Sequence, residues 1–388
     1  MGIKNRIDTL IYGISYRATT STKDRYFRRF IEESNRKLAK EVTEGWSREE
    51  RNEEYAEIVV PYWKKFGIKP KQYWFELAGS RDRKMEAGYI PSDLYYMELL
   101  PYINNMPFHW AMEDKNYLDF RFPDVKQAKI ICRRIAGEYF DKEMNNISEE
   151  DVLKICREQE GELFIKPSIY SAFGNGINHF DPSECTDSQI KAYLDGAGYN
   201  CVIQEKILQH ESLATLNPNS VNNIRVLSIF LGGQVYISLT YLRVGVKETS
   251  HVTVGDEWNA EILPDGHVHR RVWHDRGYWM DAGAEDLFSQ EFTVPCMDQI
   301  CDMVRYLHPK VSHLKWLGWD FTIDKDGNPV LIEFNAGPGD HAQRVCGRPL
   351  FGEMTDLILN DYYNIRKIEN FQARGTWTGS YDIRRYRE

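Results

Sequence analysis

The sequence lacks the features that would assign it to a membrane or secreted class. None of its apolar runs approaches the length needed to span a bilayer, and the patch Leu10-Ile11-Tyr12 is too short and too interrupted for a signal peptide. The N-terminal Met-Gly is not followed by Ser or Thr at the sixth position, which N-myristoylation requires. We therefore expect a soluble globular protein without a transmembrane segment, located in the cytoplasm.

Cysteine is scarce and is not arranged in a recognisable pattern. The seven cysteines are odd in number and scattered, and no two form a Cys-x-x-Cys pair. Neither a disulfide framework nor a zinc site is indicated. We expect reduced, mostly buried thiols.

An excess of positive charge is also missing. The chain carries 49 Lys and Arg against 58 Asp and Glu, which gives a formal net charge of -9. Because phosphate backbones reward clustered basic side chains, this balance argues against nucleic-acid binding as the main activity. Arg25, Arg28 and Arg29 lie on a probable helix and are interpreted as part of a solvated face.

What the sequence does contain is enough apolar residues, 42% of 388, for two or three subdomains. Residues 1–110 have a mostly helical pattern, with helices expected at Asp24–Thr43, Arg48–Phe66 and Ser92–Asn104. A further helix is expected around Val125–Ile135. Strands are expected at Glu162–Pro167, Gly176–Phe180, Asn200–Ile207, Asn223–Leu231 and Gln234–Val244. The fold class is α+β, with antiparallel sheets that face one another across a cleft.

The most informative segment reads GWDFTIDKDGNPVLIEFNAGPG and contains the hairpin signal Asp326-Gly327 between two alternating runs. If Lys325 faces Asn328 across a two-residue turn, the numbers of every cross-strand pair add to the same total. Asp320 then lies directly opposite Glu333.

The two faces of this hairpin differ in character. Asn335 shares the face of the two carboxylates, whereas the opposite face is apolar and belongs in the core. The apolar face comprises Trp319, Phe321, Ile323, Val330, Ile332 and Phe334. Two carboxylates about 5 Å apart repel each other, and a divalent cation such as Mg²⁺ would compensate. An exposed acidic face on a surface hairpin is the alternative, but it explains the Asn-Ala-Gly-Pro-Gly sequence poorly.

Lys166 ends a strand and precedes a loop of small residues, which include Ser171, Gly174 and Gly176. A lysine ammonium supplies a point charge for a phosphate, and glycines let backbone N–H groups approach anionic oxygens. A surface lysine before a flexible hairpin loop is the alternative.

The strand Val202–Ile207 turns polar at its end. Main-chain groups near Lys206 and Ile207 can pair with an adenine ring, and Glu205 can accept a hydrogen bond from its amino group. A strand end with a salt bridge is an equally good interpretation.

Arg225 and Arg243 interrupt apolar strand sequences, and each is a candidate for binding an anionic substrate or a γ-phosphate. With a strict two-residue turn at Gly232-Gly233, they lie on opposite faces of the hairpin. Only a bulge or an odd-length loop brings them together, so Arg225 is the stronger candidate.

Taken in chain order, these elements resemble the ATP-grasp superfamily. The resemblance rests on Lys115, Lys166 with its loop, Glu205-Lys206-Ile207, Arg225, and Asp320 with Glu333 and Asn335. Within this superfamily, the chain resembles the sugar-transfer-associated ATP-grasp family linked to bacterial surface polysaccharide assembly. The segments that carry this resemblance are Asp114-Lys115, Phe164-Ile165-Lys166-Pro167, Gln204-Glu205-Lys206, Asn223-Ile224-Arg225 and the 320–335 hairpin. The resemblance covers roughly residues 80 to 350, and only the Asp-Glu-x-Asn hairpin is specific by itself.

The resemblance implies a nucleotide held between two antiparallel-sheet subdomains. Residues 111–207 would form the small lid with the phosphate loop and hinge, and residues 208–388 the large subdomain with the metal site and a C-terminal helix. The implied cofactors are ATP and Mg²⁺, with Mn²⁺ as a substitute. The phosphates would be contacted by Lys115, Lys166, Ser171, Gly174 and Gly176. The adenine would be contacted by Gln204, Glu205, Lys206 and Ile207, and the ribose by Glu211. The metal would be bound by Asp320, Glu333 and Asn335. The implied catalytic residues are Arg225, Arg243 and Lys166.

The implied activity is an ATP-dependent carboxylate–amine ligase that forms an amide on a sugar or uronic acid unit through an acyl phosphate. Its partners would be the acid and the amine, with peripheral contact to lipid-linked glycan machinery. Asp340, His341 and Arg344 follow the metal hairpin, near where an acceptor would bind. A kinase that uses the same cleft and a nucleotide-binding scaffold that docks through the helical N-terminal region are the alternatives.

Overall fold

The computed structural model describes residues 25–169, 176–246, 251–252, 255–285 and 291–369. The chain forms two compact units. The first comprises Met1–Pro107 with Gly339–Glu388, and the second comprises Phe108–Pro338. The finer division into regions with boundaries at residues 110 and 207 stays a prediction.

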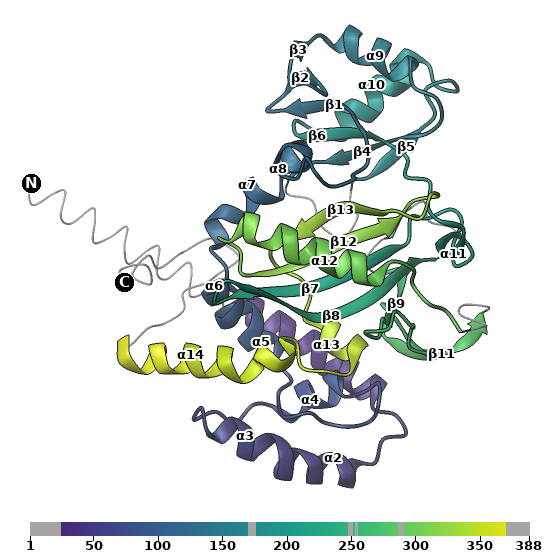
Figure 1. Ribbon diagram of the computed structural model, residues 1–388. Helices are drawn as coiled ribbons and strands as arrows, with labels where there is room; N and C mark the ends of the chain where they lie inside the picture. The colour runs from purple at the N-terminus through teal and green to yellow at the C-terminus, as the bar shows by residue number, and fades with distance from the viewer. Residues whose placement is uncertain (1–24, 170–175, 247–250, 253–254, 286–290, 370–388) are drawn as a thin grey trace, which may run out of the picture. The chain divides into compact units, whose positions relative to one another are not determined.

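The first unit is helical (Figure 1). Its helices are residues 25–42, α2 (Arg48–Glu54), α3 (Val60–Lys64), α4 (Gln72–Ala78), α5 (Ser92–Leu94), α6 (Leu100–Ile103), α13 (His341–Cys346) and α14 (Thr355–Glu369). The three helices expected from the sequence are confirmed to within two residues at each end. The side chains of Trp63, Phe75, Tyr95 and Phe351 are fully buried in this unit.

Two of these helical stretches contain a π-helical turn just before a proline. Tyr55–Val59 connects α2 to α3, and Tyr95–Leu99 connects α5 to α6. The prolines at 61 and 101 stand in the first turns of α3 and α6. Proline has no N–H, and its ring clashes with the carbonyl one turn earlier, so a wider turn there lets the helix continue.

The second unit contains two antiparallel sheets. The first has the strand order β3-β2-β1-β6-β4-β5. Its strands are β1 (Ile130–Ile135), β2 (Glu138–Asp141), β3 (Asn146–Ile147), β4 (Leu163–Pro167), β5 (Asn178–Phe180) and β6 (Cys201–Glu205). Helices α9 (Glu149–Arg157) and α10 (Asp187–Gly196) bury their apolar sides against this sheet (Figure 1). The helix expected at Val125–Ile135 is wrong, because residues 130–135 form a central strand.

The second sheet has the order β11-β10-β9-β8-β7-β12-β13. Its strands are β7 (Asn223–Leu231), β8 (Gln234–Gly245), β9 (Glu257–Glu261), β10 (Arg271–His274), β11 (Tyr278–Glu285), β12 (Trp316–Ile323) and β13 (Pro329–Asn335). Helix α12 (Met297–Leu307) covers one face and shares its apolar core (Figure 1). The short helices α7 (His109–Glu113), α8 (Leu118–Arg121) and α11 (Glu211–Ala214) complete the unit.

The β12–β13 hairpin has the predicted central pair but not the predicted turn. Asp320 pairs with Glu333, whereas Ile323 pairs with Pro329, one position out of the expected register. A bulge after Asp320 absorbs the difference, and Leu331 rather than Ile332 enters the core. The turn is longer because the Asp324 carboxylate accepts the N–H groups of residues 326 and 328.

The β7–β8 hairpin does have the two-residue turn at Gly232-Gly233, where both glycines have positive φ angles of 57° and 78°. A bulge between Leu227 and Ser228 shifts the register of the residue pairs that lie farther from the turn. Asn223 therefore pairs with Arg243, and Arg225 shares their face of the sheet. The sequence analysis named a bulge as one way to bring Arg225 and Arg243 to the same face, and the hairpin contains that bulge.

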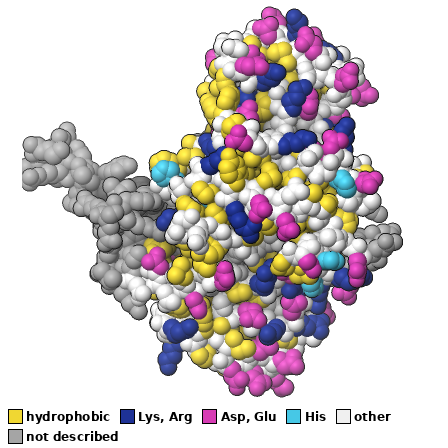
Figure 2. Space-filling view, in the orientation of Figure 1, with side chains coloured by type: hydrophobic (Ala, Val, Ile, Leu, Met, Phe, Trp, Pro, Cys, Tyr) yellow, Lys and Arg dark blue, Asp and Glu magenta, His cyan; other side chains and the backbone are white. Residues whose placement is uncertain are grey.

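Charged side chains of both signs are interspersed on the surface seen in Figure 2. Within the described part of the chain, none of the helices combines the length and apolarity that crossing a membrane demands.

Candidate nucleotide and metal site

A cluster of buried and partly buried polar side chains in the second unit lies on the β12–β13 hairpin. Asp320 is fully buried, and Arg225 holds both of its oxygens, with Nε 2.5 Å from Oδ1 and Nη2 2.7 Å from Oδ2. The Asn335 amide nitrogen lies 3.1 Å from Asp320 Oδ2 and 3.4 Å from Glu333 Oε1. The three residues predicted as metal ligands are therefore adjacent.

Lys115 neutralises the second carboxylate of the hairpin. Its Nζ lies 3.0 Å from Glu333 Oε2. Burial alone would raise the pKa of Glu333, but the ion pair with Lys115 and the positive charges of Arg225 and Lys166 lower it to about 2. Glu333 is therefore ionised at any physiological pH.

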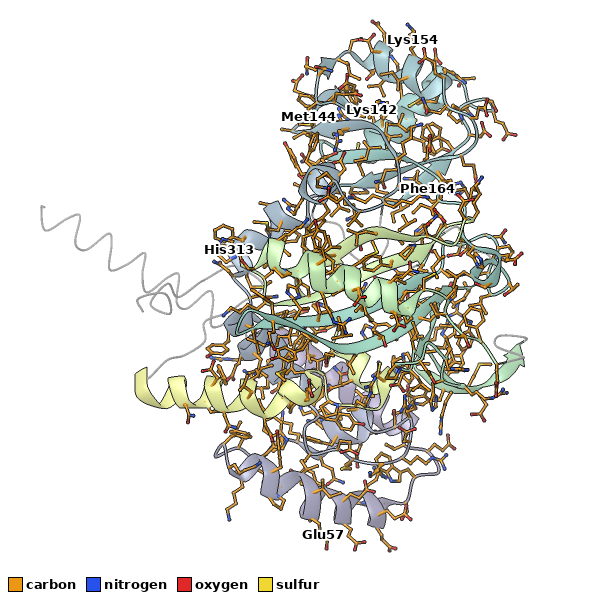
Figure 3. All side chains as sticks on the ribbon, viewed as in Figure 1. Glu57, Lys142, Met144, Lys154, Phe164 and His313 are labelled. Carbon is orange, nitrogen blue, oxygen red and sulfur yellow. The ribbon has the colours of Figure 1, made fainter. Side chains whose placement is uncertain are left out.

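Lys166 lies within the electrostatic range of the same carboxylate. Burial lowers the pKa of Lys166 to about 8, with Glu333 acting against this shift and Lys115 adding to it. The Nζ also lies 5.8 Å from the ring centroid of Phe164, which Figure 3 labels on strand β4. Two lysines from different elements thus interact electrostatically with the Glu333 carboxylate.

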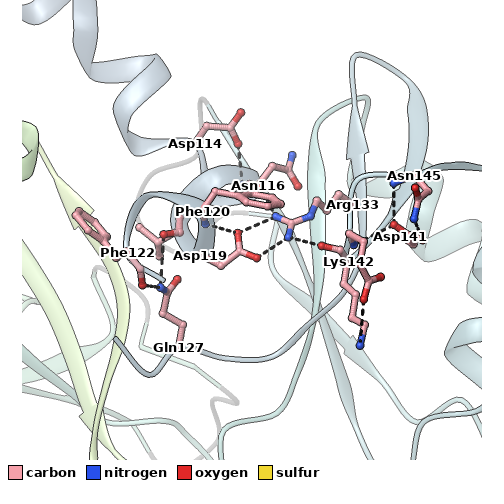
Figure 4. A network of polar contacts seen from close by, with 12 residues as sticks. Asp114, Asn116, Asp119, Phe120, Phe122, Gln127, Arg133, Asp141, Lys142 and Asn145 are labelled. Atoms are coloured by element: carbon pink, nitrogen blue, oxygen red, sulfur yellow. Dashed lines mark hydrogen bonds and ion pairs between the residues drawn. The ribbon is translucent and has the colours of Figure 1, made fainter. Parts of the chain in front are cut away.

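The position of Lys115 is fixed by a network on the first sheet (Figure 4). Asp114 accepts the Asn116 N–H at 2.9 Å, and the Lys115 N–H donates to the Ser168 carbonyl at 3.2 Å. Arg133, 1% exposed, donates to the Asn116 carbonyl and to both oxygens of Asp119. The turn that carries Lys115 is consequently bound to Ser168, which directly follows β4, the strand that carries Lys166.

Arg243 extends the cluster across the sheet. Its guanidinium makes a two-pronged pair with Glu257, at 3.1 and 2.7 Å, and its Nη1 lies 3.9 Å from Asp320 Oδ1. Burial opposes the charge of Arg243, but Glu257 and Asp320 raise its pKa above the ordinary value. Both arginines are therefore paired with carboxylates of the protein.

The sequence led us to expect a metal ion that offsets the repulsion between the Asp320 and Glu333 carboxylates. The cluster contains four carboxyl groups and four cations, so its formal charges balance; the carboxyl groups are Asp320, Glu333, Glu257 and Glu113, and the cations are Lys115, Lys166, Arg225 and Arg243. Repulsion alone is therefore not the reason for a metal, because Arg225 and Lys115 already offset it.

The oxygen donors still fit Mg²⁺. Among the described residues there is no group of three or more His, Cys, Asp or Glu side chains that could hold a metal. Mg²⁺, however, commonly takes only one or two carboxylates and completes its shell with water and phosphate oxygens. Glu333 and Asn335 are partly exposed, and rotating the Asn335 amide by half a turn presents its carbonyl oxygen. The buried Asp320 would hold the Asn335 amide in position through its hydrogen bond.

The segment assigned to adenine is engaged in ion pairs. Glu205 pairs with Lys129 at 2.5 Å, and the Lys206 ammonium pairs with Glu162. The Lys206 N–H donates to the Glu162 carbonyl at 3.1 Å, so it is not available to an adenine in this conformation. The alternative interpretation, a strand end with a salt bridge, describes these side chains; Gln204 is buried within β6.

The remaining predicted residues are less connected to the cluster. Gly176 has a φ of +78°, and a Cβ there would lie 2.9 Å from Pro167 Cγ. Glu211 is exposed at the start of α11, where the His210 N–H donates to the Ile323 carbonyl at the turn end of the hairpin. That end is three residues from Asp320, about 10 Å along the strand. Ser171 and Gly174 lie outside the described residues.

Two carboxyl groups of the site were not predicted. Glu113, at the end of α7, accepts the Ala336 N–H next to Asn335. Burial raises the pKa of Glu113 to about 7, while that hydrogen bond and Lys115 act against the shift. Glu257 is the partner of Arg243. Neither could be found from sequence, because each partner lies far away along the chain or is a backbone group.

The comparisons with known proteins identify a family model that matches the chain. The family profile described as "Sugar-transfer associated ATP-grasp" matches residues 154–357, slightly more than half of the 388 residues. No curated protein sequence matches the chain.

Two solved structures are among those to which the chain is similar. D-alanyl-alanine synthetase A from Vibrio cholerae O1 biovar eltor is 11% identical, with a TM-score of 0.40 over 65% of this chain and 66% of that chain. VanG D-Ala:D-Ser ligase from Enterococcus faecalis is 13% identical, with a TM-score of 0.41 over 66% and 63%. The chain spans less than two thirds of the length of either structure.

The matched residues contain all of the cluster except Lys115 and Glu113. ATP-grasp proteins use ATP and Mg²⁺ and are typically ATP-dependent ligases. The predicted resemblance and the α+β fold with two antiparallel sheets are confirmed. The chain belongs to the sugar-transfer-associated ATP-grasp family.

Proposed function

We propose that this protein is an ATP- and Mg²⁺-dependent ligase that joins a carboxylate to an amine, forming an amide on a sugar or uronic acid unit in surface polysaccharide biosynthesis. The observation that carries the proposal is the cluster of Lys115, Lys166 and Arg225 around Asp320 and Glu333. It combines lysine ammonium groups with oxygen donors suited to Mg²⁺, the combination that a nucleoside triphosphate requires.

In the proposed reaction, an oxygen of the acceptor carboxylate attacks the γ-phosphorus of ATP, and ADP leaves with the bridging oxygen. The amine nitrogen then attacks the acyl carbon, loses a proton, and expels phosphate. Lys115 and Lys166 would hold the phosphate oxygens and offset the charge that develops in each transition state. Bound Mg²⁺ would supply further charge neutralisation at the phosphates. No covalent protein nucleophile takes part.

The arginines would act differently from the role that the sequence indicated. Both guanidiniums are held by carboxylates of the protein, so we assign them to positioning Asp320 rather than to gripping the acceptor. Asp320 in turn orients the Asn335 amide at 3.1 Å. Their contribution would be to keep a buried carboxylate ionised and correctly directed in a region of low dielectric.

The nucleotide would extend from the lysines toward the end of β6. We propose that Gln204 to Ile207 line the adenine, with the Ile207 N–H as the donor because the Lys206 N–H is taken. Gly176, with Ser171 and Gly174, would approach the phosphates, and Glu211 would contact the ribose. Lys166 is placed at the reacting phosphate.

The test is release of ADP and phosphate by the purified protein with a panel of uronic acids and amines. We expect turnover that needs both an acid and an amine. Glu333→Gln should abolish it, while Asp326→Asn, an exposed acidic position in the turn of the same hairpin, should leave it unchanged. A stable phosphorylated product formed without amine would identify a kinase instead. Absence of turnover with every acceptor would favour the scaffold.

A further inference from the structure

Two charged groups of the hairpin cluster in the second unit have no ion-pair partner. The other members form the pairs Glu333–Lys115, Asp320–Arg225 and Glu257–Arg243. Among the residues that the structure describes, Lys166 has no carboxylate oxygen within 4.0 Å, and Glu113 has no Lys, Arg or His nitrogen within 4.0 Å. The proposed function places Lys166 at a phosphate. Glu113 is the charged group of the cluster that the proposed function does not use.

The Glu113 carboxylate is held at one oxygen and open at the other. Glu113 ends helix α7, which packs against strand β13. Its Oε1 accepts the N–H of Ala336, the residue after the predicted metal ligand Asn335. Within the described part of the chain, the Glu113 side chain makes no other hydrogen bond. Because Glu113 is partly exposed, a ligand can reach the second oxygen.

Positive charge is short around this carboxylate. Burial raises the pKa of Glu113 to about 7; the Ala336 hydrogen bond and Lys115 act against this shift, and Glu333 adds to it. The Lys115 ammonium, however, is 3.0 Å from Glu333 Oε2. Burial lowers the pKa of Lys115, but Glu333, Glu113 and Asp114 together raise it above the ordinary value. One lysine thus serves three carboxyl groups, and a further cation would stabilise the ionised form of Glu113.

The other basic side chains close to α7 are engaged elsewhere or neutral. Arg121 donates to the carbonyls of Met112 and Ala111 at the end of the helix. His109 lies one turn before Glu113, and burial lowers its pKa to about 4, so its ring is neutral at physiological pH. Neither side chain forms an ion pair with Glu113.

An ammonium group suits this carboxylate better than a metal ion does. Within the described residues, no three His, Cys, Asp or Glu side chains form a group that could hold a metal, so Glu113 does not complete a metal set with Asp320 and Glu333. Mg²⁺ also demands an octahedral arrangement of oxygens. An ammonium nitrogen has only N–H donors to satisfy, and a carboxylate is the strongest acceptor that a protein offers them.

We infer that Glu113 binds the ammonium group of the amine substrate, with the Ala336 N–H holding the carboxylate in position. The inference rests on the proposed ligase function. Because Ala336 directly follows Asn335, the amine would lie beside the proposed metal site and within the same unit. Lys166 and Glu113 would then mark the two ligands of opposite charge, the phosphate and the amine. The substrate class is a primary amine that binds as its ammonium ion, not an alcohol.

The test is calorimetric titration of the full chain, with ADP and Mg²⁺ present, using ethanolamine, ethylamine and L-alanine as ammonium probes. Ethylene glycol, which has a hydroxyl in place of the ammonium group of ethanolamine, is the uncharged probe. We expect saturable binding of at least one ammonium probe and none of ethylene glycol. Glu113→Gln should weaken this binding at least about tenfold, and Glu113→Asp should weaken it less. Glu184→Gln removes an exposed carboxylate of the second unit and should leave binding unchanged.

Several results would overturn the inference. It fails if no ammonium probe binds the unaltered protein, or if ethylene glycol binds as tightly as ethanolamine. Binding of a fluorescent ADP analogue shows whether each variant is folded, and the inference fails if Glu113→Gln binds both this analogue and the amine like the unaltered protein. If Glu113→Gln does not fold, unchanged amine affinity in Glu113→Asp is the contradicting result. A weaker dependence of ADP binding on Mg²⁺ in Glu113→Gln, with amine binding unchanged, would make Glu113 a metal ligand instead.

The subsite and the ligase function can fail separately. Amine binding that depends on Glu113, without amine-dependent ADP release, would support the subsite and contradict the ligase. Amine-dependent ADP release by Glu113→Gln with an unchanged KM for the amine would support the ligase and contradict the subsite.

Discussion

Removal of the Arg225 guanidinium is the perturbation with the largest predicted effect on the fold. In Arg225→Leu, the fully buried Asp320 carboxylate keeps only the Asn335 amide at 3.1 Å and the Arg243 guanidinium at 3.9 Å. Breaking a buried ion pair by removing one partner costs about 3–5 kcal/mol, and the nearby Arg243 places this variant at the lower end, about 3 kcal/mol. Each kcal/mol lowers the melting temperature of a unit of this size by roughly 2–4 °C, so we expect a decrease of roughly 6–12 °C.

The assay is thermal unfolding followed by circular dichroism at several pH values. Burial raises the pKa of Asp320 although Arg225 and Arg243 oppose it, and without Arg225 it rises further. A carboxyl with a raised pKa in the folded state destabilises the fold as pH rises through that pKa. The loss of stability in Arg225→Leu, relative to the unaltered protein, should therefore be larger at pH 8 than at pH 5. Arg305→Leu, which breaks an exposed pair with Asp302, is the control and should cost less than about 1 kcal/mol. A decrease within 2 °C of this control would refute the reasoning.

Three further predictions concern the nucleotide site. Because burial lowers the pKa of Lys166 to about 8, ADP affinity measured by titration should fall by up to about tenfold per pH unit above pH 8, and Lys166→Arg should remove this dependence. Gly176→Ala should destabilise the protein by about 1–3 kcal/mol in urea unfolding, since its φ of +78° and the Pro167 contact leave no place for a Cβ; an unchanged midpoint would contradict this. Glu205→Gln breaks a half-exposed pair with Lys129 and should change stability by less than about 1 kcal/mol, yet weaken ADP binding; equal affinity would remove Glu205 from the adenine site.

The sequence predicted the hairpin site well because the information is local. The alternation of β12 and β13 determines which side chains share a face, so the Asp320–Glu333 pair follows from counting. The turn and the bulge were not predictable in the same way. The Asp324 carboxylate lengthens the turn, and the bulge that restores the register depends on which of Leu331 and Ile332 packs into the core.

Features that depend on distant parts of the chain were not accessible from the sequence. Residues Ile130–Ile135 form a central strand because β2 and β6 pair with it, although their local pattern also suits a helix. The pairing of Arg243 with Glu257 depends on β9 lying beside β8. The sequence therefore suggested anion-binding arginines, and only the sheet order shows that both guanidiniums are already paired.

The central claim is that the acceptor carboxylate is activated as an acyl phosphate. The direct measurement uses an acceptor acid labelled with ¹⁸O in both carboxylate oxygens, together with ATP and amine, and analyses the released phosphate by mass spectrometry. The account predicts that one ¹⁸O atom appears in each phosphate released with ADP. Unlabelled phosphate, or release of AMP in place of ADP, would contradict it.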